Sequence, residues 1–164
     1  MKAVLIDTLE RKPTMTQTQN TLDLKTLTYQ DYPMKTYDKV RYSDTDRQGH
    51  VNNAVFACFL ETGRVELLYD PEKPLAAPGC SFVIASMTLN LLAELRWPGT
   101  AEIGTAIQRI GNSSISMVQG LYQNGVLVAT AETVIVQSNN DTKRSQPLTE
   151  DTKAFLAQFQ FRSK

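Results

Sequence analysis

The apolar positions of this chain follow two different periods, and a polar segment introduces the first of them. Residues 42–53 are mostly polar, and residues 54–60 directly after them are apolar without a break. This junction predicts a helix over residues 53–69, about 25 Å long at a rise of about 1.5 Å per residue. Asn52 or Asn53 suits the N-cap, because a short side-chain oxygen accepts an unpaired first-turn N–H. The unbroken apolar run leaves no polar face, so we expect the first two turns to be buried on every side.

From residue 82 onward the period changes to two, which indicates β-strands. An apolar row alternates from Val83 to Leu95, and Asn124-Gly125 indicates a hairpin because both residues tolerate the positive φ of a type I′ turn. The last predicted strand carries apolar side chains on both faces. One face can cover the helix, and a second subunit is the simplest cover for the other. The predicted strands are residues 35–42, 82–95, 101–107, 115–122 and 126–136.

One strand, a buried helix and a run of antiparallel strands predict an α+β domain with a curved sheet around the helix. Residues 34–164 are assigned to this single domain. Thr149 is expected to cap a short terminal helix that extends toward residue 161. Residues 1–33 show no usable period, so we expect a peripheral or flexible arm.

Composition narrows the functional classes. Lysine plus arginine number 17, as do aspartate plus glutamate, so the net charge is zero and neither nucleic acid nor an anionic membrane surface is the expected partner. Cys58 and Cys80 lack metal-ligand spacing and are interpreted as reduced thiols. No apolar run has the length of a membrane span, and the N-terminal apolar stretch is too short for a signal peptide. We expect a cytoplasmic protein without a metal or cofactor.

The polar segment also carries a motif. The string Tyr-x-Asp-Thr-Asp-x-x-Gly-His-Val-Asn-Asn-Ala over residues 42–54, followed by Glu61-x-x-Arg64, resembles the active-site segment of hot-dog-fold thioesterases. The resemblance is to the 4-hydroxybenzoyl-CoA thioesterase group, and Gly-His-Val-Asn-Asn also resembles the plant acyl-carrier-protein thioesterases. It implies a hot-dog fold and hydrolysis of an acyl-CoA or acyl-carrier-protein thioester. It further implies a homodimer or homotetramer with sites at the subunit interface.

The chemistry of thioester hydrolysis fits this segment. The reaction needs a carboxylate that attacks or activates water, and donors for the developing oxyanion. The unpaired N–H groups at a helix N-terminus supply such donors. By resemblance, the polarising N–H belongs to Asn53, and Asp46 is the nucleophile or general base. Spacing alone favours a turn-forming aspartate that caps local N–H groups, and it is the whole motif that favours catalysis by Asp46.

Other residues of the motif have weaker assignments. His50 is the only histidine; beside a helix N-terminus it should be neutral near pH 7, and it acts directly or makes a structural hydrogen bond. Gly49 and Val51 are assigned to substrate binding through the resemblance. Asp44 is expected to order the turn or to pair with Arg47.

Three further sets are candidates. Glu61 and Arg64 share a helix face, and they form either a structural ion pair or, for Glu61, support of the site. Ser113 and Ser114 match a Ser-Ser step near the pantetheine channel of relatives, although turn chemistry explains them equally well. Arg109 is a candidate for the CoA phosphates, since Arg and Lys recognise phosphate, although a solvated surface position is the alternative. The same choice applies to Arg96, Lys143 and Arg144.

Two rival functions stay open at this point. Hot-dog dehydratases and hydratases typically have Gly-His-Phe-Pro where this chain has Gly-His-Val-Asn, which counts against them. A non-catalytic acyl-CoA-binding protein would be expected to have lost Asp46, and sensors of this kind add a DNA-binding helix-turn-helix, for which residues 1–33 are too short.

Overall fold

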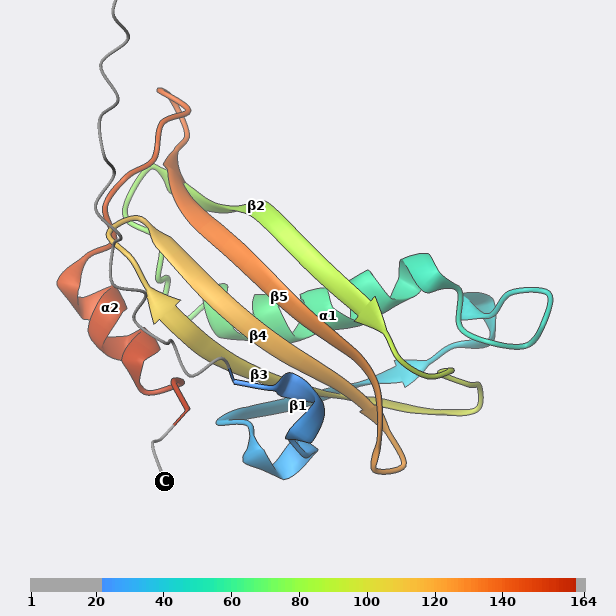
Figure 1. Ribbon diagram of the computed structural model, residues 1–164. Helices are drawn as coiled ribbons and strands as arrows, with labels where there is room; N and C mark the ends of the chain where they lie inside the picture. Colours follow the sequence, from blue (N-terminus) through green and yellow to red (C-terminus); the bar gives the residue numbers. More distant parts are fainter. Residues whose placement is uncertain (1–21, 162–164) are drawn as a thin grey trace, which may run out of the picture.

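The computed structural model describes residues 22–161, which form one antiparallel sheet in the strand order β1-β3-β4-β5-β2 with a long helix across one face (Figure 1). The α+β prediction of a curved sheet on a helix is therefore confirmed. Three short 3₁₀ turns, Leu24–Thr26, Tyr29–Asp31 and Tyr42–Asp44, precede the helix. The longer elements are β1 (Met34–Val40), α1 (Asn53–Leu68), β2 (Cys80–Leu91), β3 (Gly99–Ile110), β4 (Ser114–Gln123), β5 (Val126–Asn139) and α2 (Glu150–Ala157).

Local signals set the ends of these elements. Asn52 caps α1, and its side chain accepts the Ala54 N–H. Asn124 and Gly125 have φ values of 51° and 77°, as the predicted hairpin requires. Thr149 caps α2 by accepting the Thr152 N–H, but α2 ends at Ala157, short of residue 161. None of the helices within the described part of the chain is long and apolar enough to cross a membrane.

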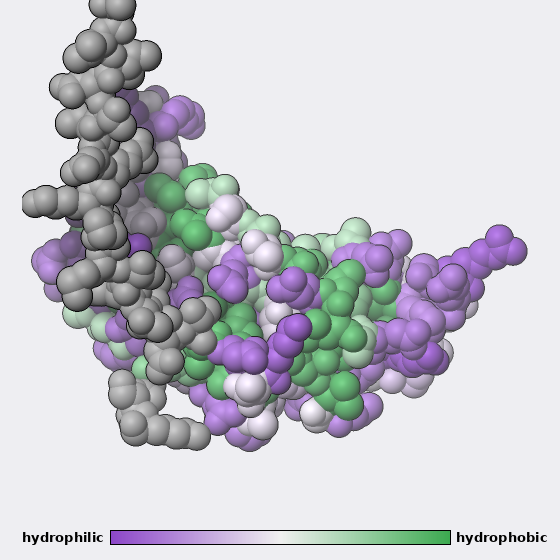
Figure 2. All heavy atoms as spheres, in the orientation of Figure 1, coloured by the Kyte–Doolittle hydropathy of each residue, from purple (hydrophilic) through white to green (hydrophobic). Residues whose placement is uncertain are grey.

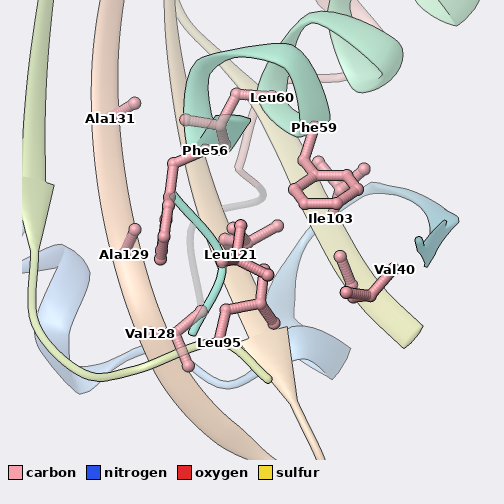
Figure 3. Packing of buried hydrophobic residues seen from close by; sticks show 12 residues of the cluster. Val40, Phe56, Phe59, Leu60, Leu95, Ile103, Leu121, Val128, Ala129 and Ala131 are labelled. Carbon is pink, nitrogen blue, oxygen red and sulfur yellow. The ribbon is translucent and has the colours of Figure 1, made fainter. Parts of the chain in front are cut away.

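The helix packs on the sheet through one face only. Phe56, Phe59 and Leu60 enter a cluster with residues of β3, β4 and β5, where Ile103 and Leu121 lie beneath the helix (Figure 3). Ala54 and Cys58 on the opposite face are exposed. The expectation that the first two turns are buried on every side is thus wrong for the single chain, because a sheet contacts a helix along one stripe.

β2 differs from its prediction. The expected apolar row runs to Leu95, but β2 ends at Leu91 and its register with β5 shifts between Ile84 and Ser86. A register irregularity interrupts the alternation of side chains. β2 is also an edge strand, and the side chain of Ile84 is 50% exposed. Leu95 is buried, but it belongs to the segment that follows the strand.

The sheet face away from α1 is covered in part by residues 24–32. The Tyr32 side chain is 1% exposed and packs in a cluster with Val118 and Tyr122. Gly104 and Gly120 are paired across β3 and β4, and a Cβ on Gly104 would lie 2.4 Å from the Tyr32 ring. These glycines make a slot for the ring. Residues 24–32 therefore lie at the periphery but pack on the sheet, so the flexible alternative does not describe them, while residues 1–21 lie outside the described residues.

The same cover changes the interpretation of β5. Leu127 packs against the Tyr32 cluster, so part of the second apolar face of β5 is covered from within the chain. Apolar residues nevertheless remain visible between polar ones over the middle of this sheet face (Figure 2).

Candidate active site

The turn before α1 is ordered by the Asp46 carboxylate. Its Oδ1 accepts the N–H groups of Gln48 at 2.8 Å and His50 at 3.3 Å. The main chain closes the same turn, since the Asp46 N–H donates to the His50 carbonyl at 2.7 Å. Gly49 has a φ of +79°, a backbone conformation in which a residue with a side chain would be strained. Within residues 22–161, no hydrogen bond or ion pair engages Oδ2, so Asp46 caps the turn through Oδ1 alone.

Asp44 has a different task. It is buried, its Oδ2 accepts the Arg41 N–H at 2.7 Å, and its carbonyl accepts the Asn52 N–H at 2.8 Å. Its ionic partner is the Arg41 guanidinium, at 3.9 Å, rather than the expected Arg47. Asp44 thus ties the entry of the turn to the start of α1.

The N-terminus of α1 opens beside this turn. Asn52 Oδ1 accepts the Ala54 N–H at 3.0 Å, and the Asn52 carbonyl accepts the Val55 N–H at 2.8 Å. Among the hydrogen bonds of the described residues, none engages the N–H of Asn53. This unpaired donor at the positive end of the helix can stabilise an anionic oxygen.

Val51, which the sequence assigned to substrate binding, is buried and does not face solvent. Its side chain is buried in the cluster beneath α1, and its N–H donates to the Leu95 carbonyl at 2.8 Å. Gly49, in contrast, is exposed at the tip of the turn.

The structure adds Glu94 and Arg96, which the sequence did not indicate as site residues together. His50 forms an isolated bridge with Arg96, and its Nε2 lies 3.4 Å from Glu94 Oε2. Hydrogen bonding from Arg96, helped by its charge and that of His50, holds the pKa of the Glu94 carboxyl below its ordinary value although burial opposes this. Residues 50 and 94 are too far apart in the sequence for any local spacing to predict that they meet. The contact between His50 and Glu94 becomes evident only from the main-chain bridge between His50 and Arg96.

Glu61 and Arg64 do not form the predicted ion pair, since no salt bridge joins them within the described range. Arg64 is 4% exposed, and its Nη1 donates to Gln119 Oε1 at 3.1 Å. Burial lowers the pKa of the Arg64 guanidinium, and the charge of Glu61 opposes this. Glu61 is exposed at a cavity of about 150 Å³ that Val65 of α1 and Ile84 of β2 also line.

Ser113, Ser114 and Arg109 lie at the far end of the sheet. The Ser114 carbonyl accepts the Gly111 N–H at 2.7 Å and the Ser113 carbonyl accepts the Gln137 N–H at 2.9 Å, so both serines shape the β3–β4 turn. β4 has 10 residues, and strands rise by about 3.3 Å per residue, which separates this turn from the opposite end by about 30 Å. Within one chain these residues do not meet Asp46.

No group of three or more His, Cys, Asp or Glu side chains lies close enough to hold a metal ion in the part of the chain that the structure describes.

Comparison with known proteins supports the class that the fold and the turn define. The family model of the thioesterase-like superfamily matches residues 40–156. The acyl-CoA thioester hydrolase YbgC of Escherichia coli O6:H1 is 30% identical over 102 residues, covering 60% of this chain and 76% of the relative.

Solved structures give the same result. A predicted thioesterase from Bacillus stearothermophilus superposes with a TM-score of 0.71 and 30% identity, covering 79% of this chain and 98% of that one. A thioesterase from Thermus thermophilus, complexed with coenzyme A and Zn, has a TM-score of 0.69 and 26% identity, covering 82% of this chain and 98% of that one.

An antiparallel sheet around a helix, with a carboxylate-bearing turn at the helix N-terminus, is the hot-dog architecture of thioesterases. The chain belongs to the thioesterase-like superfamily. The prediction of a hot-dog thioesterase is confirmed, and its narrower assignment to the 4-hydroxybenzoyl-CoA group stays a prediction.

Proposed function

We propose that this protein hydrolyses an acyl-CoA thioester to the free acid and CoA. The observation that carries the proposal is the difference between the two carboxylate oxygens of Asp46. Oδ1 accepts the hydrogen bonds that order the turn, whereas Oδ2 has no partner among residues 22–161. The unpaired Asn53 N–H at the start of α1 supplies the complementary donor. The names of YbgC and of the Thermus thermophilus complex with coenzyme A support a CoA thioester as the substrate.

Two chemical routes fit this geometry. As a nucleophile, Asp46 Oδ2 attacks the thioester carbon, the C–S bond breaks, and water then hydrolyses the mixed anhydride. As a general base, Asp46 removes a proton from a water that attacks the same carbon, and the proton later reaches the thiolate. In both routes the carbonyl oxygen becomes negative, and the Asn53 N–H stabilises it.

The full site is proposed to need a second subunit. β2 is an edge strand with exposed apolar side chains at Val83, Ile84 and Leu91, and such an edge favours pairing with another strand. If two β2 strands pair antiparallel about a two-fold axis, the Cys80 end of one lies beside the Leu91 end of the other.

That arrangement bears on the distant serines. At one end of β2, Cys80 pairs with Asn139 near the β3–β4 turn. At the other end, the segment after Leu91 donates hydrogen bonds to the Val128 carbonyl near the start of α1. The two-fold axis would therefore bring Ser113, Ser114 and Arg109 of one subunit toward Asp46 of the other. A dimer is the minimum assembly in this proposal, and a dimer of dimers, a carrier-protein donor and the cytoplasmic location stay predictions.

The proposal is tested with a panel of acyl-CoAs that vary in chain length and aromatic character. Free thiol is detected with a thiol-reactive dye, and hydration of enoyl-CoA is followed by its loss of ultraviolet absorbance. Thiol release from at least one member of the panel is the expected result. Hydration without thiol release would favour a hydratase, and calorimetric binding without either reaction would favour a non-catalytic acyl-CoA-binding protein.

A further inference from the structure

The segment between β2 and β3, residues 92–96, is anchored on two sides. The N–H groups of its first two residues donate to the Val128 carbonyl of β5 at 2.9 and 3.1 Å. Leu95 is fully buried, and its carbonyl accepts the Val51 N–H at 2.8 Å. The main chain at Glu94 is therefore fixed between the sheet and the turn that begins α1, although the Glu94 side chain reaches the surface.

Arg96 fixes the side chain of Glu94 in turn. Gln123 holds the Arg96 main chain from both sides, since its Oε1 accepts the Arg96 N–H at 3.0 Å and its Nε2 donates to the Arg96 carbonyl at 2.8 Å. The Arg96 guanidinium donates from Nε, at 3.1 Å, and from Nη2 to Glu94 Oε2. Two donors on one oxygen restrict the rotation of a carboxylate that would otherwise move freely.

His50 lies against this pair and against Asp46 at once. Its main-chain N–H donates to Asp46 Oδ1 at 3.3 Å, while its ring Nε2 is 3.4 Å from Glu94 Oε2. The bridge between His50 and Arg96 sets the ring beside the Glu94–Arg96 pair. Among the described residues, the charged side chain in contact with the imidazole is Glu94, which also binds Arg96, and the carboxylate of Asp46 contacts the main chain of His50.

We propose that Glu94 is a positioning residue for His50, which it orients by accepting the Nε2 proton. A neutral imidazole carries one proton, so an Nε2 that donates to Glu94 leaves Nδ1 as an acceptor. Nδ1 then offers a basic nitrogen to a water or a substrate group beside the turn of Asp46. Contacts of this kind are often long without substrate and shorten in the complex. The activity part of this inference rests on the proposed function, and the geometric part does not.

The geometric part is tested by NMR. His50 is the only histidine of the chain, so labelling with ¹⁵N-histidine gives the signals of one imidazole. At alkaline pH we expect the wild-type ring to carry its proton on Nε2, with an N–H proton that exchanges slowly enough to be observed. Glu94→Ala should give a mixture of tautomers and lose that proton signal. Glu94→Gln should restore both, because its amide oxygen still accepts a hydrogen bond.

Glu132→Ala is the matched control, since Glu132 is an exposed glutamate of β5 that makes none of these contacts, and it should leave the imidazole signals unchanged. A wild-type ring protonated on Nδ1, or a Glu94→Ala spectrum that matches the wild type, would overturn the proposal.

The activity part uses thiol release from acyl-CoA. We expect Glu94→Ala to lower kcat by about tenfold or more with KM nearly unchanged, and Glu94→Gln to recover most of the loss. If the imidazole changes as expected but kcat does not, the positioning role is refuted. If neither wild type nor variants release thiol while the imidazole signals follow the expected pattern, the proposed hydrolysis fails and the orientation of His50 by Glu94 stands.

Discussion

The mutation Asp46→Asn separates the two tasks of Asp46. An asparagine keeps a carbonyl oxygen for the N–H groups of Gln48 and His50, and it places an NH₂ group where Oδ2 stands. The turn should therefore persist while the charge and the attacking oxygen are lost. Loss of a general base alone costs roughly 10²–10⁴-fold in kcat, and loss of a nucleophile should cost at least as much.

Stability should change little in the same variant. In this variant the two hydrogen bonds at an exposed turn are accepted by a neutral amide oxygen and no longer by a carboxylate. This change should lower the free energy of unfolding by about 1 kcal/mol. For a chain of this size, that lowers Tm by about 2–4 °C. Thiol release gives kcat, and calorimetry gives Tm.

Asp44→Asn is the matched control in the same turn. Asp44 is buried, accepts the Arg41 N–H and faces the Arg41 guanidinium, so its neutralisation should lower Tm more than Asp46→Asn does. Its kcat should stay within about tenfold, or about 1.4 kcal/mol of activation free energy. If Asp46→Asn turned over at a near-normal rate with a reduced Tm, Asp46 would be a turn cap only and the mechanism proposed here would be refuted.

The remaining predictions concern assembly and packing. Gly63→Ala should lower the free energy of unfolding by about 1–3 kcal/mol in urea titrations, because its Cβ would lie 2.8 Å from both Ile103 Cγ2 and Thr105 Oγ1; an unchanged midpoint would contradict this close approach. Tyr32→Ala should lower the free energy of unfolding by about 3–5 kcal/mol, and a decrease under about 1 kcal/mol would show that the slot for its ring contributes little to stability. Deletion of residues 1–14 should leave folding and activity intact. Ile84→Lys should convert the assembly to single chains in light scattering, while wild type that is already an active monomer would rule out the proposed β2 pairing.

Short-range chemistry was predictable from the sequence. The Asn52 cap, the Asn124-Gly125 turn and the Thr149 cap each depend on hydrogen bonds or dihedral angles within a few residues. The alternation of apolar residues likewise indicated an antiparallel sheet. The turn around Asp46 belongs to the same class, because its partners, Gln48 and His50, are neighbours in the sequence.

Long-range pairing was not predictable. Tyr32 belongs to a segment without a period, and its burial depends on a slot between Gly104 and Gly120 of two distant strands. Glu94 resembles any surface glutamate until the bridge of His50 with Arg96 places it beside the imidazole. In both cases the side chain is positioned by residues that are far away in the sequence. A single sequence contains no pattern that indicates which distant residues lie close together in the fold.

The incorrect expectation that the first turns of α1 are buried on every side nevertheless bears on how subunits assemble. An apolar helix surface predicts burial on all sides, yet the single chain leaves Ala54 and Cys58 exposed. The cavity lined by Val65 of α1 and Ile84 of β2 shows that the outer face of α1 adjoins the exposed edge strand. A second subunit paired through β2 would lie next to this face as well as next to the edge. One two-fold interface would then account for the apolar edge, for the uncovered helix surface and for the placement of Ser113 and Asp46 at opposite ends of β4, a strand about 30 Å long.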